Sequence, residues 1–124
     1  MDGRLFDTGV LLWFLAGDKR LPRAIRAQIE DTQTPRYLSI ASAWEVAIKI
    51  SLGKLDFEGG AEEFWHLFID GGFNELPPTI ATMSIVQSLP FYHRDPFDRI
   101  LIATAHQYGV KLVSSDKTLA QYSS

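Results

Sequence analysis

The chain has 124 residues, of which 46% are hydrophobic and 22% charged, so it is long enough for one domain with a buried core, and its composition excludes general disorder. A formal net charge of −3 argues against nucleic-acid binding through a broad basic face, but acidic side chains gathered around a cation are compatible with this balance. Because cysteine is absent and the three histidines are scattered, thiolate and zinc sites are disfavoured, and a hard cation held by oxygen atoms is the metal chemistry left open.

No segment has the pattern of a membrane span or a targeting peptide. The longest apolar run, residues 10–16, is too short to cross a bilayer and lacks the flanks of a signal peptide. We therefore expect a cytoplasmic protein with no membrane partner.

Short strand-like segments alternate with helical segments along the whole chain, separated by glycine and proline. In chain order, the expected elements are strand 4–7, an apolar segment 10–15 that fits strand or helix, helix 22–30, strand 37–40, helix 42–52, helix 61–70, strand 73–76, helix 79–89, helix 95–108, strand 110–113 and helix 117–122. This alternation predicts an α/β fold: a single domain over residues 1–124 with a mostly parallel central sheet flanked by helices.

Four acidic residues from distant parts of the chain fall where expected strands end or the following helices begin. Asp7 ends the first strand and Asp116 follows the last one. Glu45 and Asp98 lie in the first turns of the helices expected at 42–52 and 95–108. Because sites in open parallel sheets form outside the carboxyl ends of the strands, we expect these acids to meet at one edge. Such a cluster suits one or two magnesium ions, and paired ions are a common means of cleaving phosphodiesters.

Three of these acids have a structural alternative when each is taken singly. Ser42 and Glu45 match a capping box. Asp98 would be favoured by the dipole of its own helix, and Asp116 would serve as an N-cap. Asp7 is the hardest of the four to explain in this way, because it lies between apolar segments where an unpartnered charge is costly. Taken together, the four positions favour a metal site.

Four segments also resemble the motifs of PIN-domain ribonucleases of the VapC type, which are toxins of type II toxin–antitoxin (VapBC) systems. They are residues 5–13 (LFDTGVLLW), 42–49 (SAWEVAIK, continued by GKL at 53–55), 93–103 (HRDPFDRILIA) and 112–116 (LVSSD). The third segment is the longest and most specific. The resemblance covers nearly the whole chain, with the motifs in order and at family-like spacing.

The resemblance implies a PIN fold and an endoribonuclease that depends on Mg²⁺ or Mn²⁺ and cuts structured RNA such as tRNA or rRNA. It assigns the catalytic and metal-binding roles to Asp7, Glu45, Asp98 and Asp116, with Ser114 as a supporting hydroxyl. It also implies a homodimer and a cognate VapB-like antitoxin, whose C-terminal segment covers the site in a hetero-oligomer. Such antitoxins often carry a DNA-binding domain, so the complex regulates its own operon.

One position departs from the family pattern: the residue after Asp7 and Thr8 is often His or Asn, and here it is Gly9. The metal ligands are unaffected, but the positioning of substrate near Asp7 is put in question. Arg94 and Arg99 flank the third acidic motif and are candidates for contacting an RNA phosphate, since the guanidinium fork matches phosphate oxygens. An equally good alternative is that they pair with nearby carboxylates and fix the loop.

Two sets of aromatic residues carry further expectations. Trp13, Trp44 and Phe97 are expected in the core. The apolar side chains of Phe64, Trp65 and Phe68 are a candidate groove for an antitoxin or a dimer contact.

Three other functions match isolated features of the sequence. The Asp-Thr-Gly at residues 7–9 matches small homodimeric aspartic proteases, but that fold is almost all β and this chain is rich in helical patterns. A phosphotransfer domain with Asp7 as nucleophile would favour a second acid two residues later, where Gly9 stands. A catalytically inactive PIN-like scaffold is disfavoured because all four acids are present.

Overall fold

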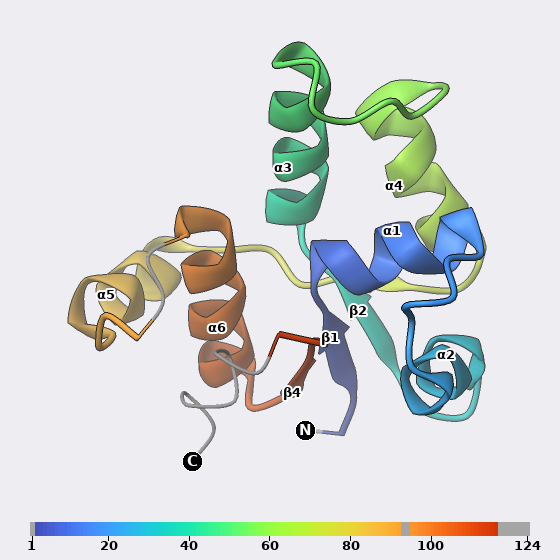
Figure 1. The fold of residues 1–124 in the computed structure, drawn as a ribbon. Coiled ribbons are helices and arrows are strands. Elements are labelled where there is room, and N and C mark those ends of the chain that lie inside the picture. Colours follow the sequence, from blue (N-terminus) through green and yellow to red (C-terminus); the bar gives the residue numbers. More distant parts are fainter. Residues whose placement is uncertain (1, 93–94, 117–124) are drawn as a thin grey trace.

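The computed structural model describes residues 2–92 and 95–116. The elements, shown in Figure 1, are β1 (Arg4–Phe6), α1 (Thr8–Ala16), α2 (Arg23–Glu30), β2 (Arg36–Leu38), α3 (Ile40–Ser51), α4 (Gly60–Asp70), β3 (Asn74–Glu75), α5 (Ile80–Ser88), α6 (Pro96–Tyr108) and β4 (Lys111–Val113). The helix expected at 117–122 lies outside the described residues, and so does Arg94.

The strands form one sheet in the order β3-β2-β1-β4, and every pairing is parallel. The alternation of strands and helices therefore confirms the expected α/β fold. The same architecture excludes the aspartic protease, because the fold of those proteases is almost all β.

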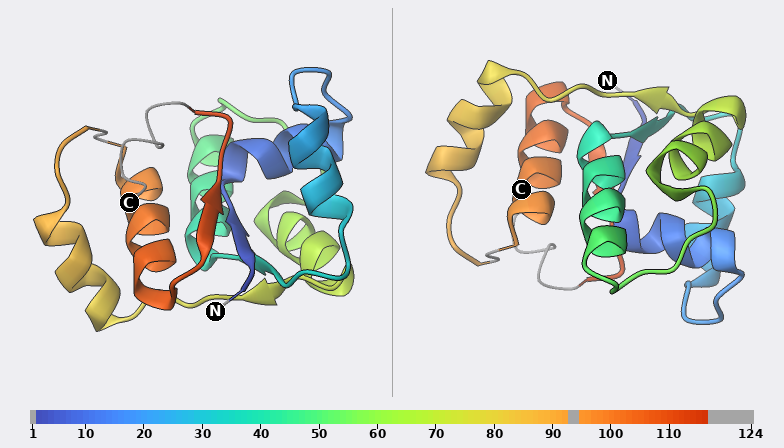
Figure 2. Two further views of the ribbon diagram at one scale, coloured as in Figure 1. Left: turned by 90° about the horizontal axis from the view of Figure 1, so that it is seen from below. Right: turned by 90° about the horizontal axis from the view of Figure 1, so that it is seen from above.

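Helices cover both faces of the sheet, with α5 and α6 on one side and α1 and α2 on the other (Figure 2). Adjacent residues of β1 point into the two layers, as expected for a strand. Leu5 packs with Leu101 and Ala105 of α6, whereas Phe6 packs with residues of α1 to α4. A strand of three residues is thus buried on both faces and carries Asp7 directly after it.

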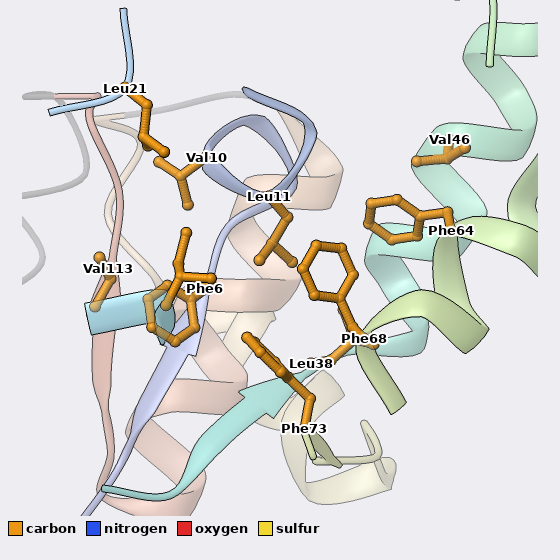
Figure 3. Packing of buried hydrophobic residues seen from close by; sticks show 11 residues of the cluster. Phe6, Val10, Leu11, Leu21, Leu38, Val46, Phe64, Phe68, Phe73 and Val113 are labelled. Carbon is orange, nitrogen blue, oxygen red and sulfur yellow. The ribbon is translucent and has the colours of Figure 1, made fainter. Parts of the chain in front are cut away.

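The larger core contains a row of aromatic rings, seen in Figure 3. The Phe64 and Phe68 ring centroids are 5.4 Å apart, and Phe68 lies 5.0 Å from Phe73, which in turn contacts Phe6. Phe64 is fully buried and Phe68 nearly so. The expectation that these residues line an open groove is therefore wrong: α4 turns them inward, and Trp65 packs at the margin of the same core.

The apolar run at 10–15 is helical and belongs to α1. The Asp7 side chain caps this helix by accepting a hydrogen bond from the Val10 backbone N–H, and Gly17 ends it in the left-handed conformation. Apart from Val10, the run contains no β-branched residue, which favours a helix over a strand. The packing buries Val10 and Leu11 completely.

Helix α3 begins two residues earlier than expected. Its N-cap is Ser39, whose side chain accepts a hydrogen bond from the Ala41 N–H. Ser42 and Glu45 consequently lie inside the helix, and the capping box expected for this pair does not form. Trp44, expected in the core, is 53% exposed, because the buried face of α3 carries small residues and Val46 instead.

Candidate metal centre

Asp7 lies at the carboxyl end of β1, where the chain turns into α1. It is 7% exposed, and its Oδ1 accepts the Val10 N–H at 2.9 Å. Burial is the main cause that raises the pKa of Asp7 above its ordinary value of 3.8. The negative charges of Glu45 and Asp116 raise it further, against hydrogen bonds from the Ser114 side chain and the Val10 N–H. Residues from β1, α3 and the end of β4 therefore act on one another electrostatically, as their placement at strand ends requires.

Glu45 is a second buried carboxylate, 6% exposed, and it reaches the site from α3. Its Oε2 accepts from the Lys49 ammonium at 2.9 Å. Its Oε1 is buried and has no hydrogen-bond partner among the described residues. Because Ser39 caps the helix, capping does not account for Glu45. An orphaned buried carboxylate oxygen is costly unless a cation or a donor satisfies it.

Asp98 lies in the first turn of α6. Asp95 is the N-cap of that helix and accepts the backbone N–H groups of Phe97 and Asp98 at 2.8 and 3.2 Å. Capping is thus performed by Asp95. The negative charges of Asp95 and Asp98 both help to raise the pKa of Lys49, after the larger contribution of its hydrogen bond to Glu45. Asp98 therefore shares a neighbourhood with Glu45.

Asp116 follows β4 and is exposed. Its backbone N–H donates to the Ser114 Oγ at 2.9 Å, and the Ser114 side chain is one of the groups that act to lower the pKa of Asp7. Ser114 therefore contacts the turn after β4 and lies near the acid after β1, and its supporting role in the site stays a prediction. The expectation that Asp116 caps a final helix concerns residues outside the described part of the chain.

The chemistry of this donor set fits a hard divalent cation. Carboxylate oxygens are the ligands that magnesium prefers, and like-charged acids need a cation to stay ionised together. As they stand, no three acidic or histidine side chains within residues 2–92 and 95–116 are arranged as a ready-made ion site. In this structure the cation paired with Glu45 is the Lys49 ammonium. The orphaned Oε1 of Glu45 and the burial of Asp7 nevertheless support the fit.

Arg99, one of the two candidate phosphate contacts, faces the protein interior. It is 6% exposed, and its guanidinium donates to the backbone oxygens of Val86, Leu89 and Pro90 at 3.0 to 3.2 Å. It also lies 4.4 Å from the centroid of the Phe91 ring. This burial speaks against the expectation that Arg99 contacts an RNA phosphate: its guanidinium holds the end of α5 and the following loop through backbone carbonyls.

A buried hydrogen bond joins the first turns of two helices, α1 and α3. The Thr8 hydroxyl donates to the Ser42 Oγ at 2.9 Å and fixes the start of α1 against α3. Because Thr8 follows Asp7 and Ser42 lies one turn before Glu45, this bond sets the spacing of the two acid-bearing segments. No local pattern signals such a contact between residues 34 positions apart.

Gly9, the position that departs from the family pattern, is exposed in the first turn of α1. A Cβ added there would meet only the Asp7 Oδ1, at 3.7 Å, which is an ordinary contact. We expect Gly9→Ala to raise the free energy of unfolding by about 0.5 kcal/mol, because alanine loses less backbone entropy in a helix. Urea unfolding monitored by circular dichroism measures this difference.

Gly17→Ala is the matched control at the other end of the same helix. Gly17 has φ 62°, a conformation that disfavours a side chain, so this change should destabilise the protein by about 1 kcal/mol. A loss of stability in Gly9→Ala would show that the position has a structural role beyond leaving space beside Asp7.

The all-parallel sheet and the buried acids near the carboxyl ends of its strands place the chain among α/β domains with an acidic site. The family model of the PIN domain matches residues 4–124, and the chain therefore belongs to the PIN domain family. No curated protein sequence matches the chain.

Among solved structures, the chain is similar to the crystal structure of VapBC2 from Rickettsia felis bound to a DNA fragment from their promoter. The TM-score is 0.69 at 8% sequence identity, over 98% of this chain and 93% of the other. At this identity the likeness establishes a shared fold. Within the part of the chain that the structure describes, no helix is long and apolar enough to span a membrane.

Proposed function

We propose that this protein is a metal-dependent endoribonuclease that cuts structured RNA, tRNA or rRNA, and acts in the cytoplasm as the toxin of a toxin–antitoxin pair. Membership of the PIN family supports a nuclease in general. The observation that carries the proposal is the buried pair of acids, Asp7 and Glu45, with one carboxylate oxygen left unsatisfied. A core position of this kind is costly to the fold and is explained by a cation-dependent function.

Asp7, Glu45, Asp98 and Asp116 would hold Mg²⁺ or Mn²⁺. When bound, such an ion activates water and neutralises charge on the phosphate under attack. Contacts within the chain position the segments that carry these acids. The Thr8–Ser42 bond sets the distance between the Asp7 and Glu45 segments, and Asp95 fixes the first turn of α6 that carries Asp98. The Ser114 hydroxyl would support Asp7.

An antitoxin of the VapB type and a second copy of the chain are the proposed partners, beside the RNA substrate. One solved structure with the same fold is that of VapBC2, bound to a promoter fragment. In this chain, α3 and its C-cap expose apolar side chains at every fourth position, next to an apolar pocket shared with α5: Ile40, Trp44, Ile48 and the C-cap residue Leu52. Exposed apolar surface of this extent is typical of proteins that work in complexes.

Purified, antitoxin-free protein incubated with total tRNA and rRNA tests the proposed activity. We expect cleavage with Mg²⁺ or Mn²⁺, none with a chelator, and none by Asp98→Asn under either metal. If the folded protein cuts no RNA with any metal, the inactive scaffold is the better interpretation. The absence of a ready-made ion site among the described residues would then support it.

A further inference from the structure

Lys49 is paired with one of the acids of the site, and the proposed chemistry does not use it. Its ammonium lies 2.9 Å from the Oε2 of Glu45, one helical turn earlier on α3. Its pKa is raised by the hydrogen bond to Glu45 and, to a smaller extent, by Asp95 and Asp98. The lysine therefore pairs directly with the acid on α3, and the charges of the two acids at the start of α6 also act on it.

The two oxygens of Glu45 have unequal surroundings. The Oε2 is paired with Lys49, whereas the Oε1 is buried without a partner among the described residues. An ordinary i,i+4 pair on a helix surface joins two solvated side chains and contributes little to stability. Here the acid is 6% exposed and its partner half-exposed, so the ammonium neutralises a charge that water cannot solvate.

We infer that Lys49 is a built-in counter-cation of the site: it stabilises the metal-free protein, leaves the Glu45 Oε1 for an incoming divalent ion, and lowers the affinity for that ion. This inference rests on the proposed metal site. Both effects follow from one charge. The ammonium offsets repulsion among the acids when no ion is present, and it repels a divalent ion when one arrives. Lys49 is thus a positioning residue that acts through Glu45.

Lys49→Met separates these effects, because it keeps most of the unbranched side chain and removes the charge. With chelator present, we expect its melting temperature to fall by about 5 °C relative to wild type, since buried acids lose their counter-charge. In calorimetric titration with Mn²⁺ alone, we expect on the order of tenfold tighter binding, as Coulomb's law gives for a unit charge near a divalent ion under water-like screening. If Lys49 had only a structural role, the variant would have a lower melting temperature but would not bind Mn²⁺ more tightly.

Two further variants complete the test. Lys49→Arg keeps the charge and should bind Mn²⁺ as wild type does. Lys54→Met removes an exposed lysine five positions later and controls for net charge. If wild type binds Mn²⁺ but Lys49→Met binds it equally or more weakly, the counter-cation inference falls and the metal site stands. If neither wild type nor Lys49→Met binds Mn²⁺, the proposed metal site fails and this inference fails with it.

Discussion

Replacing Asp7 by asparagine should reduce RNA cleavage by about a thousandfold, the scale expected when an electrostatic group at a reacting phosphate is lost. The same change should raise the stability of the metal-free protein. The asparagine side chain retains an oxygen that can accept the Val10 N–H and cap α1, so the local structure is preserved. The change removes the charge that burial and the neighbouring acids Glu45 and Asp116 make unfavourable.

The pH dependence of this stabilisation has a definite sign. The folded-state pKa of Asp7 lies above its unfolded value of 3.8, so the folded protein binds the proton more tightly. Its contribution to stability is complete below about pH 3.8 and is lost as pH rises through the folded pKa. The advantage of Asp7→Asn over wild type should therefore grow with pH.

Urea unfolding at pH 4, 6 and 8 with chelator measures that difference. Asp56→Asn, at an exposed acid away from the site, is the matched control and should show no such growth. An Asp7→Asn protein that is less stable than wild type at pH 8, or that still cleaves RNA at a near-normal rate, would contradict the assignment of Asp7 as a buried metal ligand.

Replacing Arg99 by methionine should cost about 3 kcal/mol or more, because each hydrogen bond to a charged group contributes about 1.5 to 3 kcal/mol and three carbonyls lose their donor. The Val86 and Leu89 oxygens lie at the carboxyl end of α5, where a guanidinium also interacts favourably with the helix dipole. The melting temperature should fall by roughly 10 °C. Thermal unfolding measures this fall directly.

Arg23→Met is the control, since Arg23 is an exposed arginine on α2. Its melting temperature should change little. If Arg99→Met keeps the wild-type melting temperature but binds RNA with a weaker salt dependence, then Arg99 contacts phosphate after all and the structural role is wrong.

The fold can be predicted from the sequence because its signals are local. Strands of two or three residues are flanked by strong helices, and glycine or proline separates them, so the α/β alternation is legible even where individual boundaries shift. Trp44 shows where such a prediction fails. Helix α3 has one face of small residues and one of large apolar residues; the core takes the face with Ala41, Ser42 and Val46, whereas Ile40 and Trp44 stay exposed. Hydrophobicity alone favours the opposite choice.

The site is predictable to the extent that strand ends determine it. Asp7 and Glu45 are both buried, and Asp7 interacts electrostatically with Glu45 and Asp116, as the topology of a parallel sheet implies. What the sequence does not reveal are contacts between distant side chains. The Thr8–Ser42 bond and the inward turn of Arg99 depend on how helices pack, and no spacing along the chain encodes either one. The i,i+4 spacing of Glu45 and Lys49 can be read from the sequence. The burial of Glu45, which distinguishes this pair from an ordinary surface ion pair, cannot.

The metal site itself is tested by a crystal of the full chain soaked in Mn²⁺ and measured for anomalous scattering. We expect a peak at the carboxyl edge of the sheet, with carboxylate oxygens of Asp7, Glu45 and Asp98 at about 2.1 Å, the distance typical of small divalent ions. A peak at another place, or well-ordered acids with no ion at saturating Mn²⁺, would show that these acids do not form a metal centre.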